Sequence, residues 1–398
     1  MTQPTPDRPS IGFASTYPPT ACGLATFTAA LRGAMASNRG SERGLGVVSL
    51  VEDPLTPPRP EVEYQHLNGD AASLHRAVQV LGRYQVAVLQ HEYGIFGGPD
   101  GEEVLALMAG LQIPTIVTLH TVLSNPTPRQ KEILERIVAL SGRTVVMSYT
   151  AMRRLTDRYE VDPHKVQMVP HGASMSLAGP AFTRSARPVV LTWGLIGPGK
   201  GLETAIEAFA ALKDIDPRPR YRILGRTHPK VQAAQGDVYL DGLRAMAHDL
   251  DLDDVVEFDG RYLDTESLVS IIRHADIALL PYQSTEQVTS GVLVEAIAAG
   301  KPVVATDFPH AVEMLGTGAG ALVPHSDPEA IAASLRTLLT EPGVAAGMAQ
   351  VAAAIGATLH WPVVAEQYES IASALLEPER SVAALPIRST PDDLARVG

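Results

Sequence analysis

Short runs of β-branched and other apolar residues alternate with amphipathic segments of helix length along most of this chain. In the first half, strands are expected at 11–15, 46–51, 86–90, 115–119, 144–148 and 166–169, and residues 24–35 place apolar side chains at helical spacing. Parallel strands need a crossover connection of helix length, so this alternation is typical of a parallel sheet covered by helices. The sequence therefore predicts an α/β fold.

The alternation is interrupted at 171–188, which we interpret as a linker because it is rich in Gly, Pro, Ala and Ser without clear periodicity. The pattern then restarts, with strands expected at 189–193, 221–224, 255–258, 277–280 and 302–306 and helices at 292–299 and 361–376. A chain of 398 residues exceeds the roughly 250 to 300 at which a single core stops growing. We expect an N-terminal Rossmann-like domain over 1–180, a C-terminal one over 188–360, and a flexible tail over 378–398.

Composition excludes several classes of protein. The balance of 32 basic against 44 acidic residues, −12, disfavours nucleic acid as a partner. One cysteine, Cys22, excludes an internal disulfide, and we expect it to be a small buried hydrophobe. The polar first nine residues lack the order of a secretory signal, and no apolar run is long enough to span a bilayer. We expect a cytoplasmic location, with at most peripheral contact with the inner membrane face.

Seven basic residues lie within 129–158. They either face an anionic acceptor or a membrane surface, or form an ordinary solvated helical face.

A glycine-rich loop, Gly194-Leu-Ile-Gly-Pro-Gly-Lys-Gly201, lies between an expected strand and an expected helix. Its backbone N–H groups and the helix N-terminus can face an anion, and Lys200 adds a positive charge. A Walker P-loop is disfavoured because Gly201 stands where Ser or Thr would ligate magnesium, and the glycine spacing does not fit a dinucleotide fingerprint. A plain tight turn with a surface lysine is the structural alternative. A second glycine loop, at 18–26, places Gly23 before a helix in the same way.

The segment from Gln287 to Asp307 contains a third set of candidate residues. Gly291 permits close approach of the backbone to a ligand, and Glu295 lies in the helix that follows. A carboxylate there can accept two hydrogen bonds from a ribose diol. The alternative is an early-turn glutamate that complements the helix dipole.

Together these loops resemble the GT-B-fold glycosyltransferases of family 4, or group 1, which are retaining enzymes that use nucleotide-diphosphate sugars. Besides the Gly23 loop, the resemblance rests on Gln90-His-Glu-Tyr-Gly-Ile-Phe-Gly-Gly98, Thr118-Leu-His-Thr121, Val169-Pro-His-Gly172, Gly197-Pro-Gly-Lys-Gly201 and Ser290-Gly-Val-Leu-Val-Glu-Ala-Ile-Ala-Ala-Gly-Lys-Pro-Val-Val304. It implies two Rossmann-like domains that face an interdomain cleft, with a helix over 361–377 packing toward the N-terminal domain. Leu224-Gly-Arg-Thr-His-Pro229 and Gln287-Val-Thr-Ser-Gly291 resemble a narrower bacterial branch that transfers mannose.

The resemblance assigns roles to individual residues. Lys200 would bind the distal phosphate of the donor, Glu295 the ribose hydroxyls, and His120 the transferred sugar near its 6-hydroxyl. The other donor-binding residues would be Gly23, Gly199, Arg261, Tyr262, Ser290, Gly291, Val292 and Leu293, and the acceptor-binding residues His91, Glu92 and Tyr93.

Two positions depart from the family pattern. Gln287 replaces the first of two glutamates that the family places seven residues apart, which removes a carboxylate but keeps hydrogen-bonding capacity. Glu286 is adjacent but out of register. Leu195 stands near the place of a phosphate-binding arginine in many relatives, and Arg226 is expected to supply that charge.

We therefore expect a retaining transfer of a sugar, with mannose from GDP-mannose as the leading donor, to a hydroxyl of a glycan or glycolipid. His120, Lys200, Arg226 and Gln287 are the expected catalytic residues, attack is expected on the front face, and no obligatory metal or other cofactor is expected. Two alternatives are an NAD-dependent oxidoreductase and a nucleotide-sugar-binding protein without turnover. The oligomeric state is not predicted.

Overall fold

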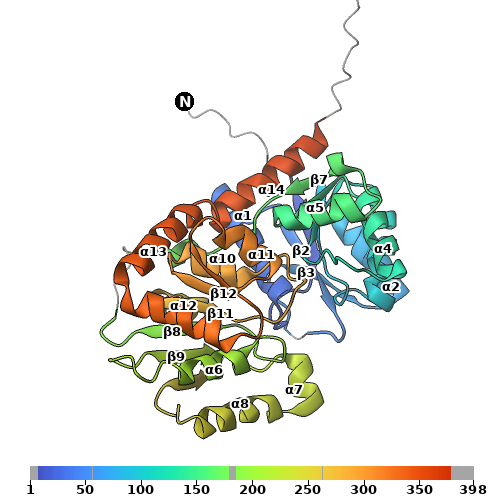
Figure 1. Ribbon diagram of the computed structural model, residues 1–398. Helices are drawn as coiled ribbons and strands as arrows, with labels where there is room; N and C mark the ends of the chain where they lie inside the picture. Colours follow the sequence, from blue (N-terminus) through green and yellow to red (C-terminus); the bar gives the residue numbers. More distant parts are fainter. Residues whose placement is uncertain (1–7, 56, 179–184, 262, 378–398) are drawn as a thin grey trace, which may run out of the picture.

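The computed structural model describes residues 8–55, 57–178, 185–261 and 263–377, which form two α/β units (Figure 1). All strand pairs in both sheets are parallel. The first sheet has seven strands in the order β3-β2-β1-β4-β5-β6-β7, and the second has six in the order β10-β9-β8-β11-β12-β13. Each order reverses direction once, and such a reversal is where open parallel sheets bind ligands.

The N-terminal unit contains β1 (Ile11–Ser15), α1 (Gly23–Arg39), β2 (Leu45–Val51), β3 (Val62–Leu67), α2 (Ala71–Leu81), β4 (Val86–His91), α3 (Glu103–Gly110), β5 (Thr115–Leu119), α4 (Pro128–Leu140), β6 (Arg143–Val146), α5 (Tyr149–Arg158) and β7 (Val166–Met168). Helices α2, α3, α4 and α5 cover one face of its sheet. The other face packs against α1 and the last helix of the chain, α14 (Trp361–Leu376).

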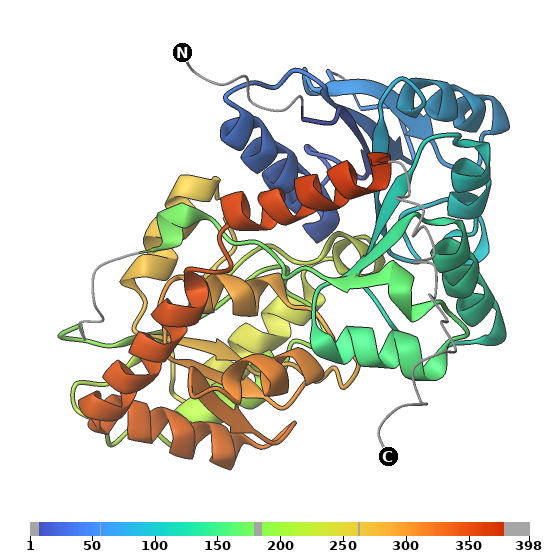
Figure 2. The same ribbon diagram turned by 90° about the horizontal axis from the view of Figure 1, so that it is seen from above.

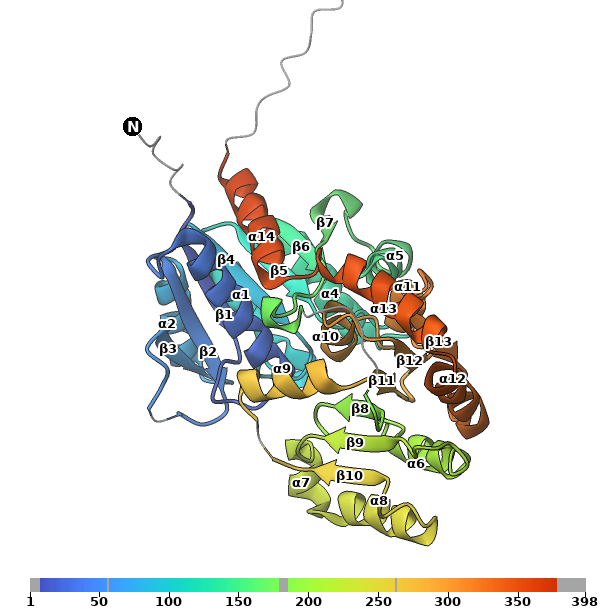
Figure 3. The same ribbon diagram turned by 90° about the vertical axis from the view of Figure 1, so that its left-hand side faces the viewer.

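The C-terminal unit contains β8 (Val189–Trp193), α6 (Leu202–Ala210), β9 (Arg220–Leu224), α7 (Pro229–Gln235), α8 (Val238–Asp249), β10 (Val256–Asp259), α9 (Thr265–His274), β11 (Ile277–Leu280), α10 (Gly291–Ala298), β12 (Val303–Thr306), α11 (Pro309–Leu315), β13 (Gly320–Val323), α12 (Pro328–Thr340) and α13 (Pro342–Gly356). Helices α6, α8 and α12 cover one face, and α9, α10, α11 and α13 cover the other. Figure 3 shows β8, β9 and β10 side by side below the N-terminal unit.

The chain crosses between the two units twice, and the two crossings lie together. Ala173 donates its N–H to the Leu359 carbonyl over 2.7 Å and accepts the N–H of Trp361 over 2.9 Å. Beyond this bridge, α14 runs alongside α1, as Figure 2 shows in red and blue. The helix is held there by a buried hydrogen bond of 2.9 Å between Thr118 and Tyr368 and by ion pairs from Arg8 and Arg39 to Glu369. The final helix of the chain thus completes the N-terminal unit.

The structure confirms the α/β class, and the expected strands appear within a few residues of their predicted bounds. Strands β3 and β13 were missed. Both are edge strands, and their burial is partial, so neither has the continuous apolar run that marks the central strands. The domain limits predicted from sequence stay a prediction, and the expected flexible tail and part of the expected linker lie outside the described residues.

Among the described helices, none is by itself long and apolar enough to cross a membrane, and α12 and α13 meet that test only as a pair bent by 97°.

Two glycines allow the loops above the second sheet to touch. Gly201 has φ +67°, and a Cβ built on it would lie 1.7 Å from the Pro281 carbonyl oxygen. Gly225 has φ +144°, and its Cβ would lie 1.8 Å from the Gly194 carbonyl oxygen. No other residue type fits either place without moving the backbone.

We expect Gly201→Ala to destabilise the protein by roughly 3 kcal/mol or more, because it adds a steric clash to an unfavourable φ. Gly199→Ala is the matched control: its φ is also positive, +86°, but no atom lies within 4 Å of the added Cβ. We expect the control to cost only about 1 kcal/mol. Calorimetric unfolding measures both, and equal losses in the two variants would contradict the steric argument.

Candidate active site

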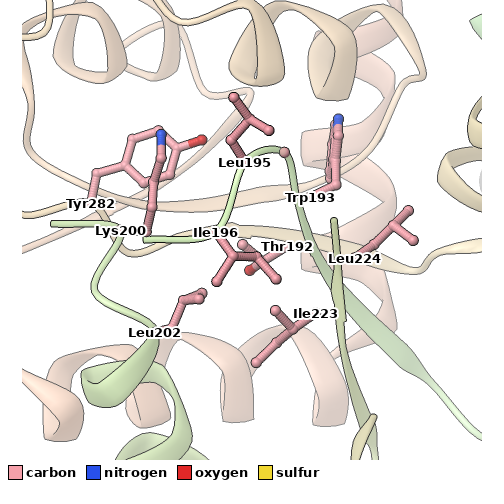
Figure 4. Close-up of a pocket in the computed structure, with 10 residues that line it drawn as sticks. Thr192, Trp193, Leu195, Ile196, Lys200, Leu202, Ile223, Leu224 and Tyr282 are labelled. Carbon is pink, nitrogen blue, oxygen red and sulfur yellow. The ribbon is translucent and has the colours of Figure 1, made fainter. Parts of the chain in front are cut away.

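The carboxyl ends of β8 and β11 meet where the strand order of the second sheet reverses. Two loops follow these strands, 194–201 and 281–290. A pocket beside them is lined by Trp193, Leu195, Lys200, Leu224 and Tyr282, among others (Figure 4). The loops are joined by the Gln283 N–H, which donates to the Gly199 carbonyl over 2.9 Å. The sequence prediction placed the glycine loop correctly at this end of the sheet.

Lys200 lies along the ring of Tyr282, with its Nζ 4.3 Å from the ring centroid (Figure 4). Burial lowers the pKa of the Lys200 ammonium. The aromatic face stabilises the charge that burial disfavours. Lys200 is therefore a held cation at the switch point, and not the surface lysine of a plain turn.

Arg226 follows β9, in the loop that pairs with the loop after β8. Its carbonyl accepts the Ile196 N–H over 2.8 Å, and its side chain is exposed. The structure thus places Arg226 in a loop next to the glycine loop, and its phosphate role stays a prediction.

The N-terminus of α10 presents backbone donors. Ser290 caps the helix by accepting the Leu293 N–H over 3.2 Å, and its own N–H donates to Nδ1 of His310 over 2.9 Å. Within the described part of the chain, the N–H groups of Gly291 and Val292 have no partner. Residues 290–293 were predicted to bind the donor. The N–H groups of Ser290 and Leu293 are already hydrogen-bonded within the protein, and those of Gly291 and Val292 can donate to a ligand.

Glu295 lies one helical turn further along, partly buried beside Trp193. Its Oε2 accepts the indole N–H of Trp193 over 2.8 Å. Burial raises the pKa of the Glu295 carboxyl, and the Trp193 hydrogen bond opposes that shift. This partner was not foreseen, because Trp193 and Glu295 are 102 residues apart. The early-turn dipole role fits poorly, since the carboxylate is fixed by a side chain of another element.

Gln287 folds back on its own segment, where its Nε2 donates to the Thr289 carbonyl over 3.1 Å. Its backbone carbonyl accepts the N–H of His310 over 3.2 Å. The neighbouring Glu286 was noted in the sequence analysis as out of register with the family pattern. It faces the N-terminal unit, where its Oε2 accepts the N–H of Ser124.

Three histidines lie at the seam between the two units. His120 shares a 2.8 Å hydrogen bond through Nε2 with Oε1 of Gln90. His171 lies against Phe27 at a ring distance of 5.0 Å, and its Nε2 is 3.0 Å from a Cβ built on Gly291. Burial lowers the pKa of His120 to about 3, of His171 to about 4 and of His310 to about 3. All three are therefore neutral near neutral pH.

His171 was noted in sequence only as part of a motif. In the structure, its ring contacts Phe27 on α1 and lies against Gly291 at the start of α10, so it links the two units at this place. Gly23 begins α1, and Cys22 caps it by accepting the Ala25 N–H. The expectation that Cys22 is a buried hydrophobe was wrong, because it is partly exposed and acts as a helix cap.

The three expected acceptor residues differ in how far they are buried. His91 is fully buried, and its ring packs edge-on against Tyr93. Neither of its ring nitrogens has a hydrogen-bond partner among the residues that the structure describes. Tyr93 donates to the Gln130 carbonyl over 3.3 Å, and Glu92 accepts the Gly94 N–H over 2.7 Å. His91 therefore lies beneath the surface, and the acceptor role of the three residues stays a prediction.

Arg261 was expected to bind the donor, and this role stays a prediction. Its guanidinium forms two hydrogen bonds to Asp259, at 2.8 and 2.7 Å. Tyr262 lies outside the described residues.

The basic segment of 129–158 is mostly paired within the protein. Arg129, Lys131 and Arg136 form ion pairs with Glu102, Glu135 and Glu132. These contacts favour the ordinary helical face over a binding surface.

Among the described residues, no three His, Cys, Asp or Glu side chains gather as metal ligands. A metal-free reaction stays a prediction.

Comparisons with known proteins fit this geometry. The profile of "Glycosyl transferases group 1" matches residues 181–354, and that of "Glycosyltransferase Family 4" matches residues 35–177. The chain belongs to the group 1, family 4 glycosyltransferases. The two matched ranges cover both units, and the glycosyltransferases of this family act on nucleotide sugars.

Curated relatives include a D-inositol 3-phosphate glycosyltransferase of Acidothermus cellulolyticus, 28% identical over 84% of this chain and 78% of the relative. Another protein of that name, from Corynebacterium glutamicum, is 30% identical over 65% of this chain and 66% of the relative.

Solved structures with the same fold include Anabaena Alr3699/HepE in complex with UDP and glucose, with a TM-score of 0.70 at 18% identity over 92% of this chain and 100% of that one. A glycosyltransferase from Rickettsia africae gives a TM-score of 0.73 at 14% identity, and the match covers 93% of this chain and 99% of that one. The fold is thus GT-B, as the sequence resemblance implied.

We expect nucleotide binding by this family member to depend on pH through Glu295. The ionised carboxylate is the better acceptor for ribose hydroxyls, and it exists only above its raised pKa. Affinity for GDP or UDP should therefore be full at higher pH and fall as the pH drops through that pKa. Trp193→Phe removes the N–H that favours ionisation, so the midpoint should move to higher pH.

Calorimetric titration across mildly acidic to mildly alkaline pH measures this dependence. Glu295→Gln is the control, and it should bind more weakly with a flatter pH profile. An unchanged midpoint in Trp193→Phe would remove Trp193 from this role.

Proposed function

We propose that this protein is a retaining glycosyltransferase that transfers mannose from GDP-mannose to a hydroxyl of a glycan or glycolipid. The observation that carries the proposal is a set of polar groups near the switch point: the cation Lys200, the backbone N–H groups of Gly291 and Val292 at the start of α10, and the carboxylate of Glu295. This set matches the two ends of a nucleoside diphosphate, because donors face the phosphates and an acceptor faces the ribose.

Departure of the nucleoside diphosphate is the step that most needs help. Negative charge grows on the leaving phosphate, and Lys200, Arg226 and the α10 donors stabilise it. The acceptor hydroxyl attacks the anomeric carbon on the face from which the phosphate leaves, so the configuration is retained. The leaving phosphate oxygen takes the acceptor proton.

His120 positions the transferred sugar in this scheme. With a pKa lowered to about 3 by burial, it is a weak base, and its neutral ring can still accept or donate a hydrogen bond. Gln287 supplies an amide at the sugar-facing end, and Glu92 and Tyr93 border the acceptor.

The acceptor class is open to a second candidate. Relatives named D-inositol 3-phosphate glycosyltransferases favour a phosphorylated polyol as acceptor.

The domain roles and the location are also part of the proposal. Residues 1–180 would form the acceptor domain and residues 188–360 the donor domain. The proposed location is cytoplasmic, with peripheral contact at the inner membrane face.

Incubation with GDP-mannose, UDP-glucose and other donors should yield transfer or hydrolysis with at least one of them, GDP-mannose first. Acceptors should include oligosaccharides and D-inositol 3-phosphate, and the reaction should persist in EDTA. Rescue by magnesium after loss in EDTA would overturn the metal-free mechanism. Tight donor binding without turnover on any acceptor would establish the binding-protein alternative, and reduced nicotinamide formation would establish an oxidoreductase.

Lys200→Ala should weaken nucleoside diphosphate binding by roughly 10- to 100-fold, because it removes a charged partner of the phosphates. Lys213→Ala is the control: Lys213 pairs with Asp251 on the surface, so the same charge is lost outside the pocket. Calorimetry with GDP and UDP measures both, and equal affinities in the two variants would remove Lys200 from the phosphate site.

A further inference from the structure

Glu286 belongs to the C-terminal unit but is bound by the N-terminal unit. The Ser124 N–H donates to its Oε2 over 2.8 Å, and the Ser124 hydroxyl donates to its Oε1 over 2.5 Å. Arg154 on α5 donates through Nη1 to Oε2 over 3.0 Å. Both oxygens of the carboxylate therefore have partners across the seam.

Arg154 also fixes the backbone at this place. The same Nη1 donates to the carbonyl of Glu286 and to the carbonyl of Val122, each over 3.0 Å. The Arg154 side chain is largely buried, with 12% of its surface exposed. Partial burial disfavours ionisation of Glu286, but the Ser124 hydrogen bonds and the charges of Arg154 and Arg158 outweigh it, so its pKa lies below its usual range. The contact is thus an ion pair with a fixed geometry.

The next residues connect this contact to the sugar-facing end of the site. Val288 is 2% exposed and packs in the apolar core of the N-terminal unit. Gln287 stands between two residues that are both held by the other unit, and its amide bonds Thr289 just before the α10 cap. The segment 286–288 is therefore placed by the N-terminal unit, although it continues into the donor-binding helix.

We propose that Glu286 is a positioning residue for sugar transfer, whose contact with Ser124 and Arg154 places Gln287 when the two units are in contact. The inference rests on the proposed function. Nucleoside diphosphate binding does not need this contact, because Lys200, Glu295 and the α10 donors all belong to the C-terminal unit. Loss of the contact should therefore reduce kcat and leave nucleotide affinity nearly unchanged.

A second carboxylate provides a matched control. Glu313 on α11 accepts the N–H groups of Tyr149 and Thr150, each over 2.9 Å, at the first turn of α5. Like Glu286 with Ser124, it joins the two units by accepting backbone N–H groups and a hydroxyl, but it does not adjoin Gln287. Glu313→Gln thus loosens the seam without acting on that segment.

The test uses the full chain with Glu286→Gln, Arg154→Gln, the double variant and Glu313→Gln. Hydrogen exchange without ligand should rise at 284–290 in the first three and only around 149–152 in the control. With the donor that turns over in wild type, kcat should fall about 10-fold or more in the first three variants, since small misplacements near a reacting centre are costly. Glu313→Gln should keep kcat within about twofold.

Affinity for GDP and UDP should stay within about twofold in all four variants. The double variant should be no worse than the poorer single variant, because both substitutions break one contact. Wild-type kcat in Glu286→Gln, equal losses in Glu286→Gln and Glu313→Gln, or additive losses would overturn the proposal. If the wild-type protein turned over none of the donors, the proposed function would be wrong. In that case, unchanged hydrogen exchange at 284–290 in Glu286→Gln and Arg154→Gln would still overturn the positioning role of the contact.

Discussion

Close contact between three loops above the second sheet determines where Lys200 lies. Gly225 touches the carbonyl of Gly194, and Gly201 touches the carbonyl of Pro281, so the loop after β8 is held between its neighbours without intervening side chains. A Cβ built on Gly194 would meet Val292 at 3.6 Å, so the same loop also lies against the first turn of α10. The loop that carries the cation Lys200 is thereby placed against the helix N-terminus that carries the backbone donors.

The histidines at the seam determine which groups can stabilise negative charge. His310 is buried and His120 and His171 are partly buried, and burial holds the pKa of each near 3 to 4. None of them carries a positive charge near neutral pH. Stabilisation of a departing diphosphate therefore falls to Lys200, to Arg226 and to the partial charges of helix N-termini, while the neutral rings supply shape and single hydrogen bonds.

The fold and the position of the glycine loop could be predicted largely from sequence, because both depend on local patterns. Central strands have continuous apolar runs, and the glycine loop lies between a strand and a helix. The edge strands β3 and β13 were missed because they are only half covered. The contacts of Trp193 with Glu295 and of Ser124 with Glu286 could not be predicted, because they join residues 102 and 162 positions apart.

Glu286 and Gln287 divide two roles between them: Glu286 anchors the segment to the N-terminal unit, and Gln287 is proposed to hydrogen-bond the sugar. In the proposed reaction, a carboxylate at 287 would add negative charge at the sugar-facing end of a site that holds a diphosphate, whose own charge grows as it leaves. An amide keeps the hydrogen-bonding capacity and avoids that repulsion. The negative charge is instead one residue earlier, where Arg154 neutralises it and the N-terminal unit uses it as an anchor. An electron-deficient sugar in this site would then be stabilised chiefly by the leaving phosphate itself, which is the group that front-face attack requires to stay close.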